Sequence, residues 1–147
     1  MSTTIKHLVK AAVTMGFLAA ASSAMAAADL NQPAPSFDAV GADGKPVKLS
    51  DFKGKTVVLE WTNHECPFVA KHYDSGNMPT LQKDAAGKGV VWMQVLSSAP
   101  GKQGHVDGAT AQKLNASRKA APAVTVLDPE GKIGKMYGAT NLIYNLI

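Results

Sequence analysis

The sequence predicts an α/β fold with a mainly parallel central sheet. Three apolar runs, at residues 56–61, 90–96 and 122–127, show little alternation, which is typical of strands buried on both faces. Helical patterns separate these runs. The order strand, helix, strand, helix, strand is typical of a parallel sheet with right-handed crossovers and helices on both faces. The 147 residues suffice for one domain.

Residues 1–26 predict a secretory signal peptide. Lys6 and Lys10 precede an alanine-rich apolar segment, which closes with the small-x-small pattern of Ala24 and Ala26. An uncleaved membrane anchor is the alternative, but the segment is short and contains Gly, Thr and Ser, so it would span a bilayer poorly. We therefore expect cleavage after Ala26, one mature domain at 27–147, a periplasmic or secreted location, and no stable membrane insertion after cleavage.

Turn and cap residues mark the other elements. An Asp-Gly pair at 43–44, between two short strand-like pieces, predicts a β-hairpin before the first buried strand. A helix is predicted from residue 67 to about residue 86, broken or kinked near Gly76. Asp107 is the predicted cap of the next helix, and the turn at 128–131 leads into a short one.

The charge pattern gives little support to a nucleic-acid partner. The formal net charge is +4, but Lys6 and Lys10 lie in the predicted leader. The rest of the sequence has no cluster of Lys and Arg with interleaved aromatic residues, so we expect no nucleic acid as a partner.

Cys66 is the only cysteine, so the chain cannot form an internal disulfide. It stands where a buried strand ends and a helix begins, and Pro67 suits the first position of that helix. The backbone N–H groups and the positive end of the helix dipole would favour the thiolate there. We therefore predict a reactive thiol. The alternative is a structural cysteine buried in the core, which is common among free cysteines.

Several strings resemble a known family. The strings "APSF", "DGKPVKLSDFKGK", "TVVLEW" and "ECPF", followed by "VVWMQVLSS" and "TVLDPEGKIGKMYGA", resemble redoxin domains of the thioredoxin-fold superfamily. This group includes the peroxiredoxins, that is, the alkyl hydroperoxide reductase and thiol-specific antioxidant proteins. The resemblance covers most of residues 31–139 and is closest to a peroxiredoxin-like branch with the string W-x-N-x-x-C-P-F-V-x-K-H-Y. It implies a thioredoxin-like fold and an antioxidant or oxidoreductase activity.

By this resemblance, Cys66 would be the catalytic residue, which attacks a peroxide or a disulfide as the thiolate. Trp61 and Asn63 would line the approach to it. Asn63 occupies the place of a threonine in peroxiredoxins, and Val69 occupies that of the second cysteine in thioredoxins. Turnover would therefore need an external thiol reductant or a disulfide-bearing protein as partner, with a peroxide as the other candidate substrate.

Three further residues are expected to support this site. Pro67 fixes the start of the helix, and Lys71 and His72 lie one to two turns further along it, where they could assist the thiolate. His64 and His72, together with Cys66, raise the hypothesis of a metal site. Their spacing places Cys66 and His72 on different parts of the helix surface, so we expect no metal ion and no cofactor.

The resemblance also implies a cis-proline turn, two antiparallel strands and a closing helix after residue 140, whereas this sequence continues with "NLIYNLI". We therefore expect an incomplete fold in which the C-terminal β-hairpin and helix are missing. The strand at 56–61 would then present an open edge, which either pairs with a second copy in a homodimer or is covered by the apolar tail.

A competing hypothesis comes from another functional class. The chain would then be a non-catalytic thioredoxin-like binding or assembly protein, or an inactive truncated remnant. Asn63 and Val69 favour the binding protein, whereas the Cys66-Pro67 pair favours the enzyme. Arg118 is the only arginine and would suit a peroxide site, but its position predicts the surface end of a helix.

Overall fold

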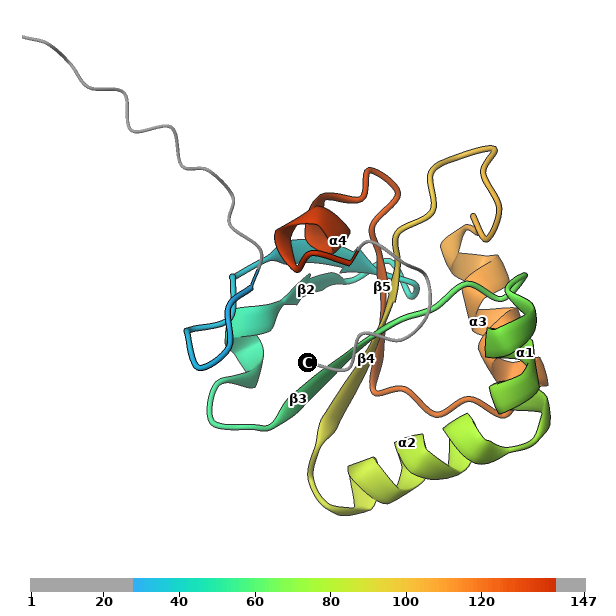
Figure 1. Ribbon diagram of the computed structural model, residues 1–147, viewed down its shortest axis with the longest axis horizontal. Helices are drawn as coiled ribbons and strands as arrows, with labels where there is room; N and C mark the ends of the chain where they lie inside the picture. The colour runs from blue at the N-terminus through green and yellow to red at the C-terminus, as the bar shows by residue number, and fades with distance from the viewer. Residues whose placement is uncertain (1–27, 140–147) are drawn as a thin grey trace, which may run out of the picture.

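A five-stranded mixed sheet forms the centre of the protein (Figure 1). The computed structural model describes residues 28–139. The predicted signal peptide and the tail at 140–147, with the expectations attached to them, lie outside this range. The strands are β1 (Asp38–Gly41), β2 (Pro46–Lys48), β3 (Val57–Trp61), β4 (Val91–Leu96) and β5 (Val124–Leu127), in the spatial order β2-β1-β5-β4-β3.

Strand pairing confirms the predicted α/β class. β3, β4 and β5 are parallel, and their register places Leu59 beside Met93 and Val95 beside Val126. β1 is antiparallel to both β5 and β2, so the N-terminal hairpin extends the parallel part into a mixed sheet. The predicted turn closes this hairpin, because Gly44 has a positive φ of 79° that glycine adopts without strain.

The helices also follow the sequence prediction. They are α1 (Pro67–Asp74), α2 (Asn77–Gly87), α3 (Gly108–Ser117) and α4 (Lys132–Met136), with a short 3-10 helix, η1 (Leu49–Phe52). Gly76 is left-handed, with φ 75°, and separates α1 from α2 as predicted. Asp107 caps α3, since its Oδ1 accepts a hydrogen bond of 2.7 Å from the Thr110 amide.

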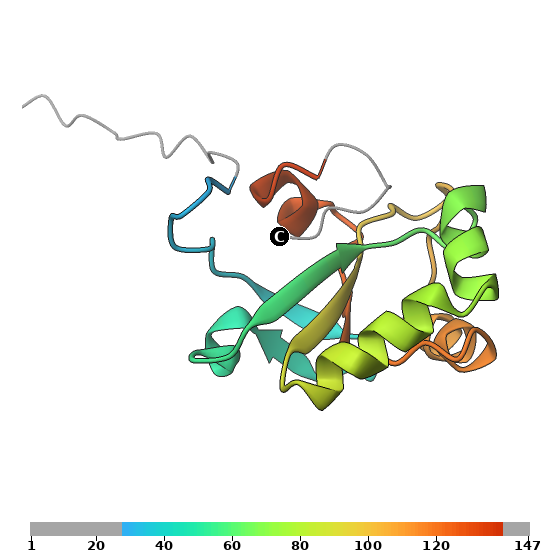
Figure 2. The ribbon, with the colours of Figure 1, turned by 60° about the horizontal axis from the view of Figure 1, so that its bottom comes forward.

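Alternate residues of the strands define two cores, one on each face of the sheet. On one face Leu59, Met93 and Val126 pack with Ile133 and Tyr137 at α4. On the other face Trp92 packs with side chains of α1 and α2, namely Val69, Tyr73 and Met78. Figure 2 shows α4 on one side of the sheet and α2 on the other, so helices cover both faces, as the sequence predicts.

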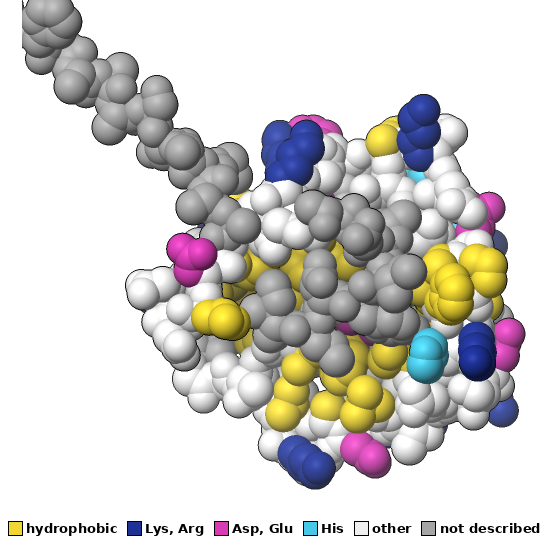
Figure 3. All heavy atoms as spheres, in the orientation of Figure 1, with side chains coloured by type: hydrophobic (Ala, Val, Ile, Leu, Met, Phe, Trp, Pro, Cys, Tyr) yellow, Lys and Arg dark blue, Asp and Glu magenta, His cyan; other side chains and the backbone are white. Residues whose placement is uncertain are grey.

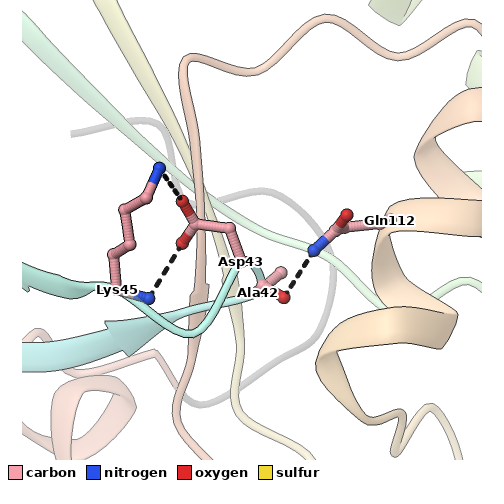
Figure 4. Close-up of polar contacts among 4 residues, drawn as sticks. All are labelled: Ala42, Asp43, Lys45 and Gln112. Atoms are coloured by element: carbon pink, nitrogen blue, oxygen red, sulfur yellow. Dashed lines mark hydrogen bonds and ion pairs between the residues drawn. The ribbon is translucent and has the colours of Figure 1, made fainter.

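The hairpin is tied to α3. Asp43 accepts a hydrogen bond from the Lys45 amide at 3.1 Å and pairs with the Lys45 ammonium at 3.1 Å, both on the surface (Figure 4). Gln112 of α3 donates through Nε2 to the Ala42 carbonyl at 2.7 Å. The contacts between Asp43 and Lys45 stay within the hairpin turn, and the Gln112 hydrogen bond joins that turn to α3.

β3 forms one edge of the sheet within the described residues, because it pairs there with β4 alone. The described sheet thus ends at β3, and the expectation that this edge is open or covered by the tail stays a prediction. A homodimer through this edge stays a prediction. No helix within 28–139 is long and apolar enough to cross a membrane.

Candidate functional site

Cys66 lies in a short turn between the end of β3 and the start of α1. It occupies the N-cap position with extended backbone angles, φ −77° and ψ 123°, and Pro67 begins the helix. The Cys66 amide donates to the Asn63 carbonyl at 3.1 Å, and the Cys66 carbonyl accepts from the Ala70 amide at 2.9 Å. The predicted placement of the thiol at a strand-to-helix junction is therefore confirmed.

The Cys66 sulfur differs from the expectation in one respect. We expected it to face the free N–H groups of the helix, but the side chain accepts no hydrogen bond from the first turn of α1. Instead it is half-buried against the apolar cluster of Val69, Tyr73, Met78 and Trp92. The physical reason is this packing, because the thiol gains apolar contact by turning toward the cluster.

Asn63 is buried within the turn that presents Cys66. Its Oδ1 accepts a hydrogen bond of 2.9 Å from the Glu65 amide, which closes a local turn. Its Nδ2 has no hydrogen-bond partner among residues 28–139. A buried amide donor without an acceptor is costly, so folding leaves one hydrogen bond of Asn63 unmade.

The loop between β4 and α3 closes against this turn. Gly104 donates its backbone N–H to the Glu65 carboxylate. Its φ is +80°, and a Cβ at this position would collide with Oδ1 of Asn63. Gly104 therefore lets the loop approach the Cys66 turn more closely than any other residue would allow.

Trp61 lies on the opposite face of the sheet from the cluster that holds Cys66. It is buried among the α4 core residues, and its Nε1 donates to Ser97 Oγ at 3.2 Å. Ser97 Oγ in turn donates to Asp128 Oδ2 at 2.6 Å. The contacts of Trp61 are those of a core side chain, and its expected role at the approach to Cys66 stays a prediction.

Lys71 and His72 lie on α1, one to two turns after Cys66, as the sequence predicts. Lys71 is exposed, and His72 is half-buried with its Nδ1 at 3.1 Å from Asn77 Nδ2 at the start of α2. Their assistance to the thiolate stays a prediction.

A buried polar network lies beneath α1 and was not found in the sequence. Glu60 of β3 is fully buried and accepts hydrogen bonds from Tyr73 Oη at 2.7 Å, Trp92 Nε1 at 2.7 Å and Gln82 Nε2 at 3.1 Å. Gln94 Nε2 donates to Tyr73 Oη at 2.6 Å. The available signal was the presence of Glu and Gln in otherwise apolar strands.

Burial sets the protonation of this network. Loss of hydration raises the pKa of Glu60 above its ordinary value of 4.5, against the opposing effect of the three hydrogen bonds. The pKa of Tyr73 is also raised, mainly by burial and then by the negative charge of Glu60. The same cluster that includes Tyr73 contacts Cys66, so the network lies directly behind the thiol.

Arg118 confirms one part of a sequence prediction and corrects another. It lies at the end of a helix as expected, because it is the C-cap of α3. Its side chain is half-buried rather than on the surface, and its guanidinium carbon lies 4.1 Å from the centroid of the Tyr73 ring. Its Nη2 donates to Asn115 Oδ1 at 3.0 Å, whereas Nε and Nη1 are buried without a partner in the described part of the chain. The cause is cation–π attraction, which draws the guanidinium inward over Tyr73.

Possible metal ligands are not grouped. Within the described range, no three His, Cys, Asp or Glu side chains lie close enough together to hold a metal ion. The geometry brings Cys66, Asn63 and Pro67 together in one turn, with Glu65 and Gly104 as the contacts that hold it.

Comparison with known proteins assigns the sequence to a family. A family model described as Redoxin matches residues 29–143. No curated protein matches the sequence.

Solved structures share the fold. An exposed lipoprotein thioredoxin, Etrx1, from Streptococcus pneumoniae strain TIGR4 is 26% identical with a TM-score of 0.55, over 77% of this chain and 86% of that chain. A candidate thiol:disulfide interchange protein DsbE from Chlorobium tepidum is 27% identical with a TM-score of 0.57, over 74% and 69%. An uncharacterized conserved protein from Geobacillus kaustophilus is 23% identical with a TM-score of 0.63, over 73% and 56%. This chain thus spans little more than half of the Geobacillus structure, and the shared fold is thioredoxin-like.

Proposed function

Because the chain belongs to the Redoxin family, we propose that it is a thiol-disulfide oxidoreductase that works through Cys66 alone. The observation that carries this proposal is the position of the chain's one thiol, half-exposed at the N-cap of α1 and at the carboxyl end of a parallel strand. Ligands and reactive groups of α/β sheets are found at this end of the strands. The thioredoxin and interchange protein named above, at 26% and 27% identity, support the same chemistry.

The exchange follows from the chemistry of a single thiol. The Cys66 thiolate attacks one sulfur of an external disulfide, forms a mixed disulfide with it, and releases the other sulfur as a thiolate that takes up a proton. Val69 stands where a second cysteine would otherwise resolve this intermediate. An external thiol therefore attacks the mixed disulfide and restores Cys66. The leader sequence motivates a periplasmic or secreted site of action, where disulfides are abundant.

Asn63 favours a second candidate substrate, a peroxide. Its Nδ2 lies in the turn that presents Cys66 and has no partner in the described part. Because this atom is buried, it would donate to a peroxide oxygen only after the turn opens. In this reaction the thiolate attacks one peroxide oxygen, becomes a sulfenic acid, and releases an alkoxide or hydroxide that takes up a proton. An external thiol then condenses with the sulfenic acid, with loss of water, and a second thiol reduces the mixed disulfide.

A turnover assay tests the proposal. The chain is given a small disulfide or a hydroperoxide with glutathione as the external thiol, and glutathione oxidation is followed. We expect turnover that depends on both glutathione and protein, disappears in Cys66→Ser, and passes through a mixed disulfide visible by intact mass. Turnover that survives in Cys66→Ser would contradict the proposal.

A further inference from the structure

The helix that follows Cys66 has an apolar and basic stripe on its outer side. Phe68 is 61% exposed and is the one aromatic side chain among the exposed large hydrophobic residues of the described part. Lys71 and Ser75 are also exposed, and their spacing places them on the same face of α1 as Phe68. We call Phe68, Lys71 and Ser75 the α1 stripe. Figure 3 shows hydrophobic side chains over α1 with a lysine and a histidine beside them.

The α1 stripe leads from Cys66 to a basic hollow. Ser75 lines this hollow, which has a volume of about 450 Å³ and lies at the junction of α1 and α2. Its charged lining residues are Lys83, Arg118, Lys119 and Asp74, so positive charge predominates. Lys71 adds a further positive charge on the stripe. The hollow at the far end of the stripe is therefore complementary to an acidic segment.

We propose that the α1 stripe and the basic hollow dock an extended protein segment with an apolar side chain beside its reacting cysteine and acidic residues about four positions away. Phe68 provides the apolar anchor, since aromatic side chains are enriched at the cores of protein interfaces. The hollow provides the site for the acidic residues. This inference rests on the proposed function and adds the chemistry of the partner to it.

The dimensions of α1 determine the spacing in the partner. The eight residues of α1 rise by about 12 Å along the helix axis. An extended chain advances about 3.3 Å per residue, so about four residues span the distance from Cys66 to the hollow. The acidic residues of the partner are therefore placed about four positions from its cysteine.

Peptides with an activated aromatic disulfide on their cysteine test this arrangement. One peptide has leucine beside the cysteine and aspartates about four positions away on either side. In two matched peptides, lysines replace the aspartates or serine replaces the leucine. For each peptide, the rate constant of its reaction with Cys66 is measured. It is divided by the rate constant for the reaction of Cys66 with free cysteine that carries the same activated disulfide. We expect the highest ratio for the acidic, leucine-containing peptide.

Protein variants assign the preference to the surface. We expect Phe68→Ala to lower the ratio for the acidic peptide about fivefold or more, as for loss of an aromatic anchor. Lys71→Glu should reverse the preference between the aspartate and lysine peptides. Leu81→Ala is the matched control, because Leu81 is also exposed, at 42%, but belongs to α2 and lies outside the stripe. This control should keep the ratio of the unchanged chain.

The outcomes separate the two proposals. Equal ratios for the three peptides, or an equal loss in Phe68→Ala and Leu81→Ala, would overturn the docking proposal while leaving the thiol chemistry intact. A failure of the proposed function would show instead as a Cys66 that reacts with the reference disulfide no faster than in the unfolded chain. In that case docking is tested without thiol chemistry, by titrating the acidic peptide with serine in place of its cysteine into the Cys66→Ser protein. Changes in amide NMR shifts on α1 and around the hollow would support the docking proposal, and their absence would overturn it.

Discussion

At the scale of single residues, the least expected feature is the carboxyl group of Glu60. It has no exposed surface, and three neutral side chains donate hydrogen bonds to it. No cation forms an ion pair with it among the described residues, although the charge of Arg118 acts on it at longer range. Since ionisation in such a site loses hydration, Glu60 keeps its proton to a higher pH in the folded chain than in the unfolded one.

This difference predicts a pH dependence of stability. The pKa of Glu60 is raised on folding, so its effect on stability is most favourable below its ordinary value of 4.5 and decreases as the pH rises toward the folded-state value. Each unit of pKa difference corresponds to about 1.4 kcal/mol. Glu60→Gln removes this titration. The free energy of unfolding of the variant should therefore not decrease over this pH range as that of the unchanged chain does. Urea denaturation of both proteins measures the effect. The pH is varied from about 4 to about 8, which is roughly the range over which buried carboxyl groups titrate. Parallel curves would contradict this account of Glu60.

Sequence reasoning at this scale found Cys66 and Pro67, but it did not single out Glu60, and it placed the Arg118 side chain at the surface. The Cys-Pro pair is a local signal, because the N-cap and first helical positions have residue preferences of their own. Glu60 and Arg118 are far apart in the sequence and meet through Tyr73, which donates a hydrogen bond to Glu60 and stacks under Arg118. Their environment depends on three elements, and no spacing within one segment indicates it.

At the scale of elements, the loop between β4 and α3 is the contact that holds the Cys66 turn. Gly104 bonds to Glu65 and lies directly against Asn63. The strands, the break at Gly76 and the cap at Asp107 could be predicted, because apolar runs, glycine and capping residues are local signals. The closure of this loop could not, because it depends on contact between residues far apart in the sequence.

Two glycines of the same loop give a matched pair for this contact. Gly101 and Gly104 have positive φ values of 74° and 80°, but a Cβ at Gly101 would meet nothing within 4 Å, whereas one at Gly104 would collide with Asn63. Gly101→Ala should cost about 1 kcal/mol of stability from backbone strain alone. Gly104→Ala should cost roughly 3 kcal/mol or more, because steric overlap adds to the strain.

Chemical denaturation and the rate of Cys66 alkylation measure both variants. Gly104→Ala should change the alkylation rate, because Asn63 and Glu65 lie in the turn that presents the thiol. Gly101→Ala should keep the rate of the unchanged chain. Equal losses of stability in the two variants would mean that Gly104 does not hold the turn.

At the scale of the whole molecule, the sheet places Cys66 at the carboxyl end of β3 and separates two cores. The mainly parallel α/β arrangement with its hairpin could be predicted, since the order of strand and helix patterns restricts the connections that a chain can make. The sequence did not predict which face of the sheet each strand residue occupies, and only the structure shows this. It places Trp61 with α4 and Glu60 with α1 and α2.

The proposed function requires that this fold make Cys66 a reactive thiol. The most direct test is the second-order rate constant for reaction of Cys66 with a small disulfide at neutral pH, in the folded chain and in the same chain unfolded by urea. N-acetylcysteine in both solutions corrects for the effect of urea, and intact mass identifies the mixed disulfide. We predict a faster reaction in the folded chain. An equal or slower reaction there would show that the fold buries Cys66 as a structural residue and would contradict the proposed function.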